Sequence, residues 1–192
     1  DFSGEESKEQ VVTITFSHPV VDEKQIGKPA DGIVEFSPKI DGKALWKDDR
    51  TLIFIPSQKL ALSSEYSVVF SPNVKSLDNR KPDSKQTLKF QTVRIEGELV
   101  LMGSPKRALA KPAIRVSFTQ PVPFEQISQK CDFQTASASH RLVLEEGQSD
   151  KLSKSYRVVP STDLTLDTDW SFVCAADIRG SEGSLGTAEK IT

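Results

Sequence analysis

Residues 53–70, IFIPSQKLALSSEYSVVF, align without a gap with residues 157–174, RVVPSTDLTLDTDWSFVC, at a constant offset of 104 positions. A second pair of segments, TFSHPV at 15–20 and SFTQPV at 117–122, is separated by 102 positions. Several matches at nearly one offset predict that a single folding unit occurs twice in this chain. The best matched positions are Pro56 and Pro160, Leu60 and Leu164, Leu62 and Leu166, and Tyr66 and Trp170.

Both copies have the pattern of short β-strands. Apolar residues alternate with others in EYSVVF at 65–70 and in DWSFVC at 169–174, which places them on one face of an extended segment. Apolar runs at 11–16 and 113–118 are each followed by a proline three residues later, which ends strand pairing. No window of about 11 residues keeps a helical period. We therefore expect an all-β fold of two consecutive sandwiches of antiparallel sheets.

The length of 192 residues suits two domains of ordinary size. The copies divide near TVRIEGE at 92–98, so we expect one domain over 1–92 and another over 93–192. The last residues of the second copy fall where its final strand begins, and we expect the protein to continue past Thr192. The expected core residues are Ile14, Phe16, Phe54, Tyr66, Val68 and Phe70 in the first domain, and Val116, Phe118, Val158, Trp170 and Phe172 in the second.

Composition excludes some partners. A net charge of −2 argues against nucleic acid, whose phosphates need a basic protein surface. No apolar run approaches the roughly 20 residues of a membrane-spanning helix, so no transmembrane segment is expected. The first residues, DFSGEESKEQ, contain neither Met nor an apolar segment, so we expect that a signal was cleaved or that the chain is part of a longer one.

The segments FSHPV at 16–20 and LWKDDRTLIFIPSQKLALSSEYSVVFSPNVKSLDN at 45–79 occur in the first copy. In this order they resemble the bacterial Ig-like domains of surface-layer proteins. The resemblance implies two Ig-like (fibronectin III- or macroglobulin-like) sandwiches. The second copy departs from the pattern at the loop DIRGSEGSLG and has no Trp equivalent to Trp46. The motif residues are Phe16–Val20, Trp46, Asp49–Pro56, Leu60–Val68 and Val74–Asn79, and the second copy keeps Phe118–Val122, Tyr156–Pro160 and Leu164–Phe172.

Tandem domains of this kind, with a Cys pair and an RGSEGSLG-like ending, also resemble the N-terminal part of bacterial alpha-2-macroglobulins, envelope proteins that trap proteases. This resemblance implies an exported chain in the periplasm or at the cell surface, with a lipid anchor upstream of Asp1 as one arrangement. It implies other domains of the same longer chain as partners, and proteases through downstream domains. The reactive CGEQ motif of that family is absent here, so trapping chemistry is expected outside these residues.

Neither histidine has the surroundings of a catalytic base. His18 lies in the duplicated motif, where the second copy has Gln120, so a residue that does not titrate is tolerated there. His140, in SASHRL, has no Cys or carboxylate at the spacing of metal ligands. We expect both to be solvated or locally hydrogen-bonded. The chain also lacks a glycine-rich phosphate loop and a nucleophile elbow, so neither catalysis nor a cofactor is expected.

The acidic pair Asp48 and Asp49 and the dipeptide Asp78-Asn79 have an ordinary structural interpretation. Asp48 and Asp49 occupy a predicted hairpin tip, and Asp78 and Asn79 occupy a loop before a strand. Such residues favour turns, and a weak calcium site is the alternative. No metal site is predicted.

The two cysteines, Cys131 and Cys174, both lie in the second copy at apolar, core-facing positions. They are either free buried thiols or a disulfide between two strands, comparable to the inter-sheet bridge of antibody domains. An even count in an exported chain favours the disulfide.

Three classes of function follow. The first is a non-catalytic structural or scaffold region of an exported envelope protein. The alternative is an adhesin or a carbohydrate-binding or surface-binding Ig-like module, for which Trp46 is the candidate binding residue, although a Trp in this motif more often packs over the sheet edge. An enzyme is the least supported class.

Overall fold

The computed structural model describes residues 11–81, 88–103 and 110–192. By their contacts these residues divide into two compact units. Unit 1 contains residues 11–60 and 66–90, and unit 2 contains residues 61–65 and 91–192. The expected first domain, 1–92, begins with ten residues outside the described ranges, and the independence of the two domains stays a prediction.

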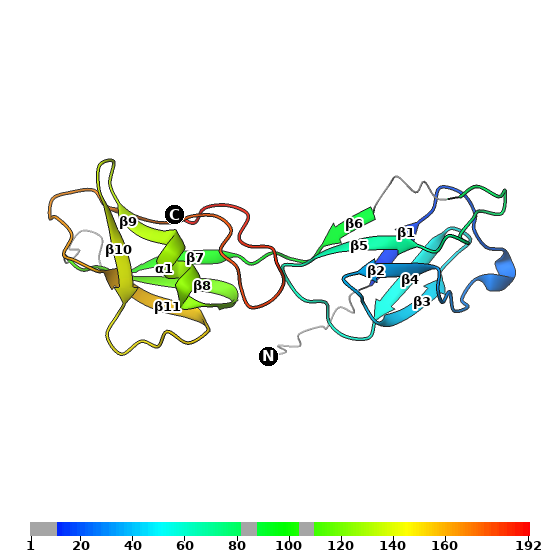
Figure 1. Ribbon diagram of the computed structural model, residues 1–192, viewed down its shortest axis with the longest axis horizontal. Coiled ribbons are helices and arrows are strands. Elements are labelled where there is room, and N and C mark those ends of the chain that lie inside the picture. Colours follow the sequence, from blue (N-terminus) through cyan, green and yellow to red (C-terminus); the bar gives the residue numbers. More distant parts are fainter. Residues whose placement is uncertain (1–10, 82–87, 104–109) are drawn as a thin grey trace, which may run out of the picture. The chain divides into compact units, whose positions relative to one another are not determined.

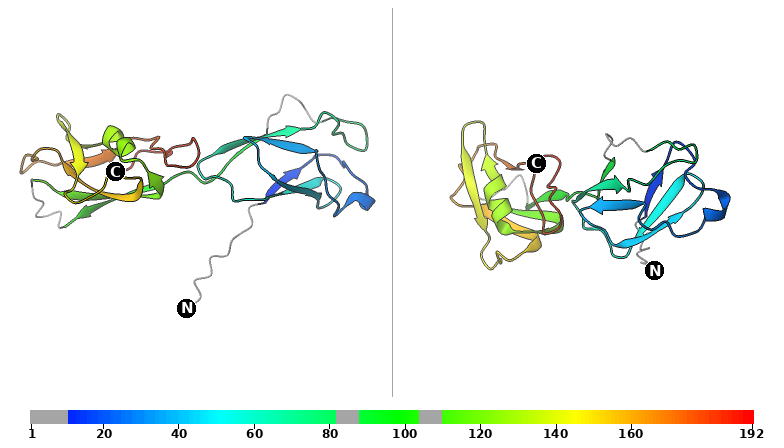
Figure 2. Two further views of the ribbon diagram at one scale, coloured as in Figure 1. Left: turned by 60° about the horizontal axis from the view of Figure 1, so that its bottom comes forward. Right: turned by 45° about the vertical axis from the view of Figure 1, so that its right-hand side comes forward.

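Unit 1 is a sandwich of two three-stranded antiparallel sheets, ordered β1-β4-β3 and β2-β5-β6 (Figures 1 and 2). The ring of Phe36 on β2 lies 4.5 Å, between centroids, from that of Phe54 on β4, so the inner faces of the two sheets meet. The strands of unit 1 are β1 Val12–Thr15, β2 Val34–Ser37, β3 Gly42–Trp46, β4 Thr51–Pro56, β5 Glu65–Phe70 and β6 Leu88–Gln91.

Unit 2 forms one continuous order of six strands, β12-β9-β10-β11-β8-β7. β10 joins its two halves, because its first residues pair with β9 and its last residues pair with β11. On β8 every second side chain is buried, from Ile114 to Val122. The strands of unit 2 are β7 Gly97–Met102, β8 Ala113–Val122, β9 Cys131–Gln134, β10 Ser139–Leu144, β11 Ser153–Pro160 and β12 Ser171–Cys174. The fold is therefore all-β, as the alternating pattern predicts.

The strand pairings of the two units correspond residue by residue. β1 pairs with β4 in the same register as β8 pairs with β11, and β2 pairs with β5 in the same register as β9 pairs with β12. The corresponding opposite pairs are Ile14–Leu52 with Val116–Tyr156, and Val34–Phe70 with Cys131–Cys174. Equivalent positions along the sequence thus occupy equivalent positions in the sheets.

Two short helices follow the proline-containing segments. They are η1 Glu23–Gln25 in unit 1 and α1 Phe124–Lys130 in unit 2. An isolated helix of seven residues is unstable in water, and α1 packs against the core through Ile127, which is fully buried. The equivalent Ile26 is exposed. The sequence does not predict α1, because its stability depends on this tertiary contact.

Most of the expected core residues are buried, and the others are partly buried. Phe16 and Phe70 pack at the border of the unit 1 core, and Trp170 and Phe172 do the same in unit 2. Each of these four lies at or next to the end of a strand, where burial is incomplete. The rest of the expected set is buried: Ile14, Phe54, Tyr66, Val68, Val116, Phe118 and Val158.

The segment between β4 and β5 belongs partly to unit 2. Ser63 is fully buried and its Oγ accepts hydrogen bonds from the backbone N–H of Ile95 and from Nε2 of Gln120, each at 2.8 Å. Its backbone N–H donates to the carbonyl of Val93 at 2.9 Å, and its own carbonyl accepts from the N–H of Leu185 at 2.8 Å. Residues 61–65 therefore complete the polar contacts of unit 2, although the repeat places them in the first copy.

Candidate functional site

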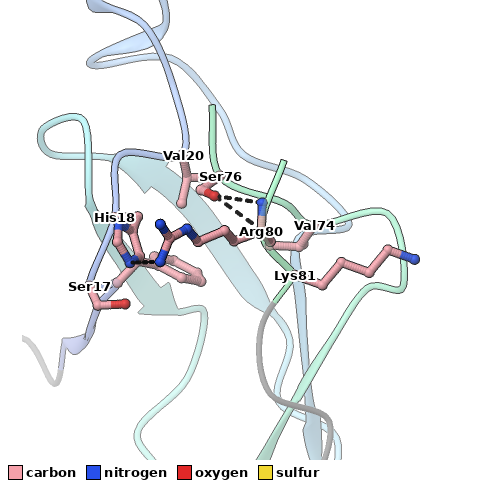
Figure 3. Close-up of a pocket in the computed structure, with 8 residues that line it drawn as sticks. Ser17, His18, Val20, Val74, Ser76, Arg80 and Lys81 are labelled. Atoms are coloured by element: carbon pink, nitrogen blue, oxygen red, sulfur yellow. Dashed lines mark hydrogen bonds between the residues drawn. The ribbon is translucent and has the colours of Figure 1, made fainter. Parts of the chain in front are cut away.

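The two ends of the first copy's motif meet in unit 1. Residues 16–20 follow β1, and residues 74–80 follow β5. The backbone N–H of Leu77 donates to the carbonyl of Pro19 at 2.8 Å, which holds the two segments together. Between them lies a pocket with a volume of about 60 Å³ (Figure 3). The apolar lining residues are Phe16, Val20 and Val74. The hydroxyl groups come from Ser17 and Ser76, and the basic groups from His18, Arg80 and Lys81.

His18 and Arg80 point toward one another across this pocket (Figure 3). Nε2 of His18 lies 3.4 Å from Nη1 of Arg80. A guanidinium can only donate, so Nε2 accepts and the imidazole proton is assigned to Nδ1. Nε of Arg80 also pairs with Oδ2 of Asp78 at 2.8 Å. The ammonium of Lys81 extends away from His18, so it contributes charge to the rim rather than a direct contact.

The loop that carries Arg80 is held by its own polar groups. The backbone N–H of Arg80 donates to Oγ of Ser76 at 3.0 Å, and Ser76 donates to the carboxylate of Asp78. This hydrogen bond, followed by the charge of Arg80, lowers the pKa of Asp78 below the usual value for Asp. Asn79 has a positive φ of 64°, which Asn tolerates better than most residues. The predicted Asp78-Asn79 loop therefore positions Arg80 at the pocket.

His140 does not take part in this site. It lies in unit 2, where Nδ1 is 2.6 Å from Oγ1 of Thr162 and the imidazole meets the indole of Trp170 edge to face, with 4.9 Å between centroids. Both histidines thus have local partners, and they lie in different units.

The acidic pair at the β3–β4 turn has a structural role. Oδ1 of Asp48 accepts hydrogen bonds from the backbone N–H groups of Arg50 and Thr51, at 2.9 and 2.7 Å. The first of these bonds is the main reason why the pKa of Asp48 is lowered. Asp49 makes a longer contact with Arg50, at 3.8 Å. Within the described ranges, no three His, Cys, Asp or Glu side chains gather in a way that could hold a metal ion.

Trp46 is not an exposed binding residue. Only 3% of its surface is accessible, and its ring lies 5.9 Å from that of Phe16 inside the unit 1 core. The surface-binding role considered for Trp46 therefore has no support in its position, because an aromatic side chain must be accessible to stack on a ligand. Burial against the sheets is the role that the sequence favoured.

Cys131 and Cys174 form a disulfide, with sulfur atoms 2.10 Å apart and Cα atoms 4.0 Å apart. Both residues are fully buried. They lie directly opposite one another on the neighbouring strands β9 and β12. The bridge therefore joins two strands of one sheet, and the comparison with an inter-sheet bridge was wrong, because β9 and β12 are hydrogen-bonded neighbours in that sheet.

Comparison with known proteins finds a family match over the first half of the chain. Residues 3–92 match the family model of the bacterial Ig-like domain. Ig-like domains of this family are generally non-catalytic and typically extracellular. No curated protein matches the chain. Over the part of the chain that the structure describes, no helix has the length and apolar character needed to cross a membrane.

Two sets of residues in these contacts were missed by sequence reasoning. Arg80 and Lys81 follow the predicted loop and read only as surface charges, yet they line the pocket with His18. Ser63 reads as a turn residue, yet it is fully buried. The signal that could have linked His18 to this loop is the motif itself, whose first segment ends at Val20 and whose last segment begins at Val74.

Proposed function

We propose that this chain is a non-catalytic structural region of an exported bacterial envelope protein, namely the N-terminal domains of an alpha-2-macroglobulin-like protease trap. The observation that carries the proposal is the shared register of the two units, together with the bacterial Ig-like match of residues 3–92. A domain of this family repeated along one chain is suited to act as a spacer or docking region.

The nature of the corresponding positions supports a structural role. Positions that correspond between the units are mainly apolar and buried, as Ile14 and Val116 are. Polar positions differ, as His18 and Gln120 do. A catalytic site needs several unlike polar residues that converge on one place. Corresponding apolar residues instead specify a core, and this supports selection for shape and stability.

The disulfide supports export to an oxidising compartment. Disulfides form and persist in the periplasm and at cell surfaces and are rare in the cytosol. The Cys131–Cys174 bridge is buried within the core of unit 2. We propose that the protein lies in the periplasm or at the cell surface, with a lipid anchor upstream of Asp1 as one arrangement and other domains of the same chain as its direct partners.

The experiment mixes the purified chain with trypsin in equimolar amounts. Hydrolysis of a large and of a small substrate is followed, and a denaturing gel is run for covalent adducts. We expect full activity on both substrates and no adduct, because the trapping chemistry belongs to downstream domains. Inhibition or capture by these 192 residues alone would overturn the scaffold role.

The protease-trap assignment has its own test. The coding sequence after Thr192 is expected to encode a CGEQ thioester motif. If the complete downstream sequence lacks this motif, the protease-trap assignment is refuted and the scaffold role still stands. Specific binding of the chain to a glycan array would instead favour the adhesin alternative.

A further inference from the structure

The described residues that line the pocket in unit 1 include two permanent cations, Arg80 and Lys81, and no carboxylate. Residues 74–81 contain Lys75, Arg80 and Lys81, and Asp78 is the single carboxylate among them. Asp78 is already engaged by Ser76 and by Nε of Arg80. Among the described residues, Nη2 of Arg80 has no hydrogen-bond partner. The pocket therefore offers donors and a net positive charge to an incoming group.

The two innermost polar groups are arranged to act together. Nη1 of Arg80 lies 3.4 Å from Nε2 of His18, which accepts its hydrogen bond and so orients the guanidinium on one side. The guanidinium is held on its other side by Asp78. Because Arg80 is oriented from both sides, less side-chain freedom is lost when a ligand binds than for an unattached surface arginine.

We propose that this pocket binds the side-chain carboxylate of an acidic polypeptide segment, with Arg80, oriented by His18 and Asp78, as the anion contact. A carboxylate is planar and matches one edge of a guanidinium. The methylene groups of Glu or Asp would lie against Phe16, Val20 and Val74, which form the apolar wall. This inference does not depend on the scaffold function.

Chemistry separates this ligand from two others. A sugar acid carries hydroxyl groups that need acceptors, and Asp78, the one carboxylate of residues 74–81, is already engaged. A phosphate carries more charge and favours several donors around it, whereas the ammonium of Lys81 extends away from His18 and Arg80 is the cation in contact with it.

The test measures binding to the full chain by NMR. The ¹⁵N-labelled protein is titrated with a terminally blocked peptide that contains one Glu, with its Gln counterpart, with galacturonate, and with inorganic phosphate. We expect the Glu peptide to shift the resonances of His18 and of residues 74–81, with a dissociation constant of about 1 mM, and the Gln peptide to have no effect. Binding should weaken as salt is added, because the site is at the surface.

Matched variants decide whether the pocket or the general charge is responsible. Arg80→Gln should weaken binding by about tenfold or more, because a hydrogen bond to a charged group is lost. His18→Gln, which installs the residue of the second copy, should weaken it by about threefold. Lys75→Gln removes the same charge from the same loop, but Lys75 does not line the pocket and bonds to Asn79. It should change affinity by less than about twofold.

The outcomes are distinct. A loss with Arg80→Gln but not with Lys75→Gln, at unchanged thermal stability, supports the carboxylate site. An equal loss of affinity in both variants would mean that diffuse charge attraction causes the binding, and it would overturn the proposed carboxylate site. Stronger binding of galacturonate or phosphate than of the Glu peptide overturns the polypeptide ligand, and so does the absence of shifts with every probe.

Discussion

Ser63→Ala tests the buried polar contacts of residues 61–65 in unit 2. The Oγ of Ser63 accepts hydrogen bonds from the backbone N–H of Ile95 and from Nε2 of Gln120. Both of these residues are 1% exposed. Alanine removes the acceptor of both donors in a place closed to water, while the volume of the side chain hardly changes.

The expected loss in the free energy of unfolding follows from the two donors that are left without an acceptor. A buried donor without a partner costs about 1–3 kcal/mol. Two such donors give a loss of about 3 kcal/mol in the free energy of unfolding of unit 2, since the Gln120 amide can reorient in part. At about 4–8 °C per kcal/mol for a domain of this size, the Tm of unit 2 should fall by roughly 15 °C.

The assay is urea and thermal unfolding followed by the fluorescence of Trp170 in a Trp46→Phe background, because these are the two tryptophans of the chain. The matched control is Ser64→Ala, which removes one hydrogen bond, to the carbonyl of Leu62 at 3.1 Å, and should cost about 1 kcal/mol.

A rescue variant sharpens the same test. Adding Gln120→Leu to Ser63→Ala should recover part of the loss, because replacing both partners by apolar groups leaves one donor fewer unsatisfied. If Ser63→Ala costs no more than Ser64→Ala, the buried hydrogen bonds of Ser63 do not stabilise unit 2 and the reasoning fails.

Three further predictions concern the disulfide, a glycine and a turn. Replacing Cys131 and Cys174 by Ala should lower the free energy of unfolding, measured in urea, by about 4 kcal/mol, because the bridge closes a loop with a sequence separation of 43. Two titratable thiols in the denatured, unreduced wild type would show that no bridge exists. Gly183→Ala should destabilise unit 2 by about 2 kcal/mol or more in the same assay, because Gly183 has a φ of +64° and a Cβ there would overlap the carbonyl of Ser63. Asp48 has a lowered pKa in the folded chain, so its stabilising effect is complete at neutral pH and is lost as the pH falls through that pKa, below about 4; the advantage of wild type over Asp48→Asn in urea should shrink there, and a constant difference down to low pH would contradict it.

Much of the sheet structure could be predicted from the sequence. The alternation of Tyr66 and Val68 on β5 identifies the buried face, and both side chains are buried in the structure. The constant offset identifies which residues are equivalent, and the strand registers agree with it. These features depend on a period of two along an extended chain, and a period is a local property that a sequence displays directly.

The candidate site was predictable only in part. The sequence predicted a solvated or locally hydrogen-bonded His18, because Gln120 takes its place in the second copy, and a turn at Asp78. Nothing local indicated that Arg80 would lie 3.4 Å from His18, since 62 positions separate them. Their meeting depends on the path of two loops, which no periodic pattern describes.

The sequence by itself determined that this protein is built from short strands, that a pattern recurs in its two halves, and which apolar side chains face a core. Only the tertiary structure decided that Ser63 belongs to the contacts of unit 2, that the disulfide joins neighbouring strands of one sheet, and that Gln120 takes a core-facing place on β8. The physical reason is that burial of apolar surface is nondirectional and follows from spacing along the chain. Hydrogen bonds and disulfides instead require particular atoms from distant segments to meet within narrow distances and angles.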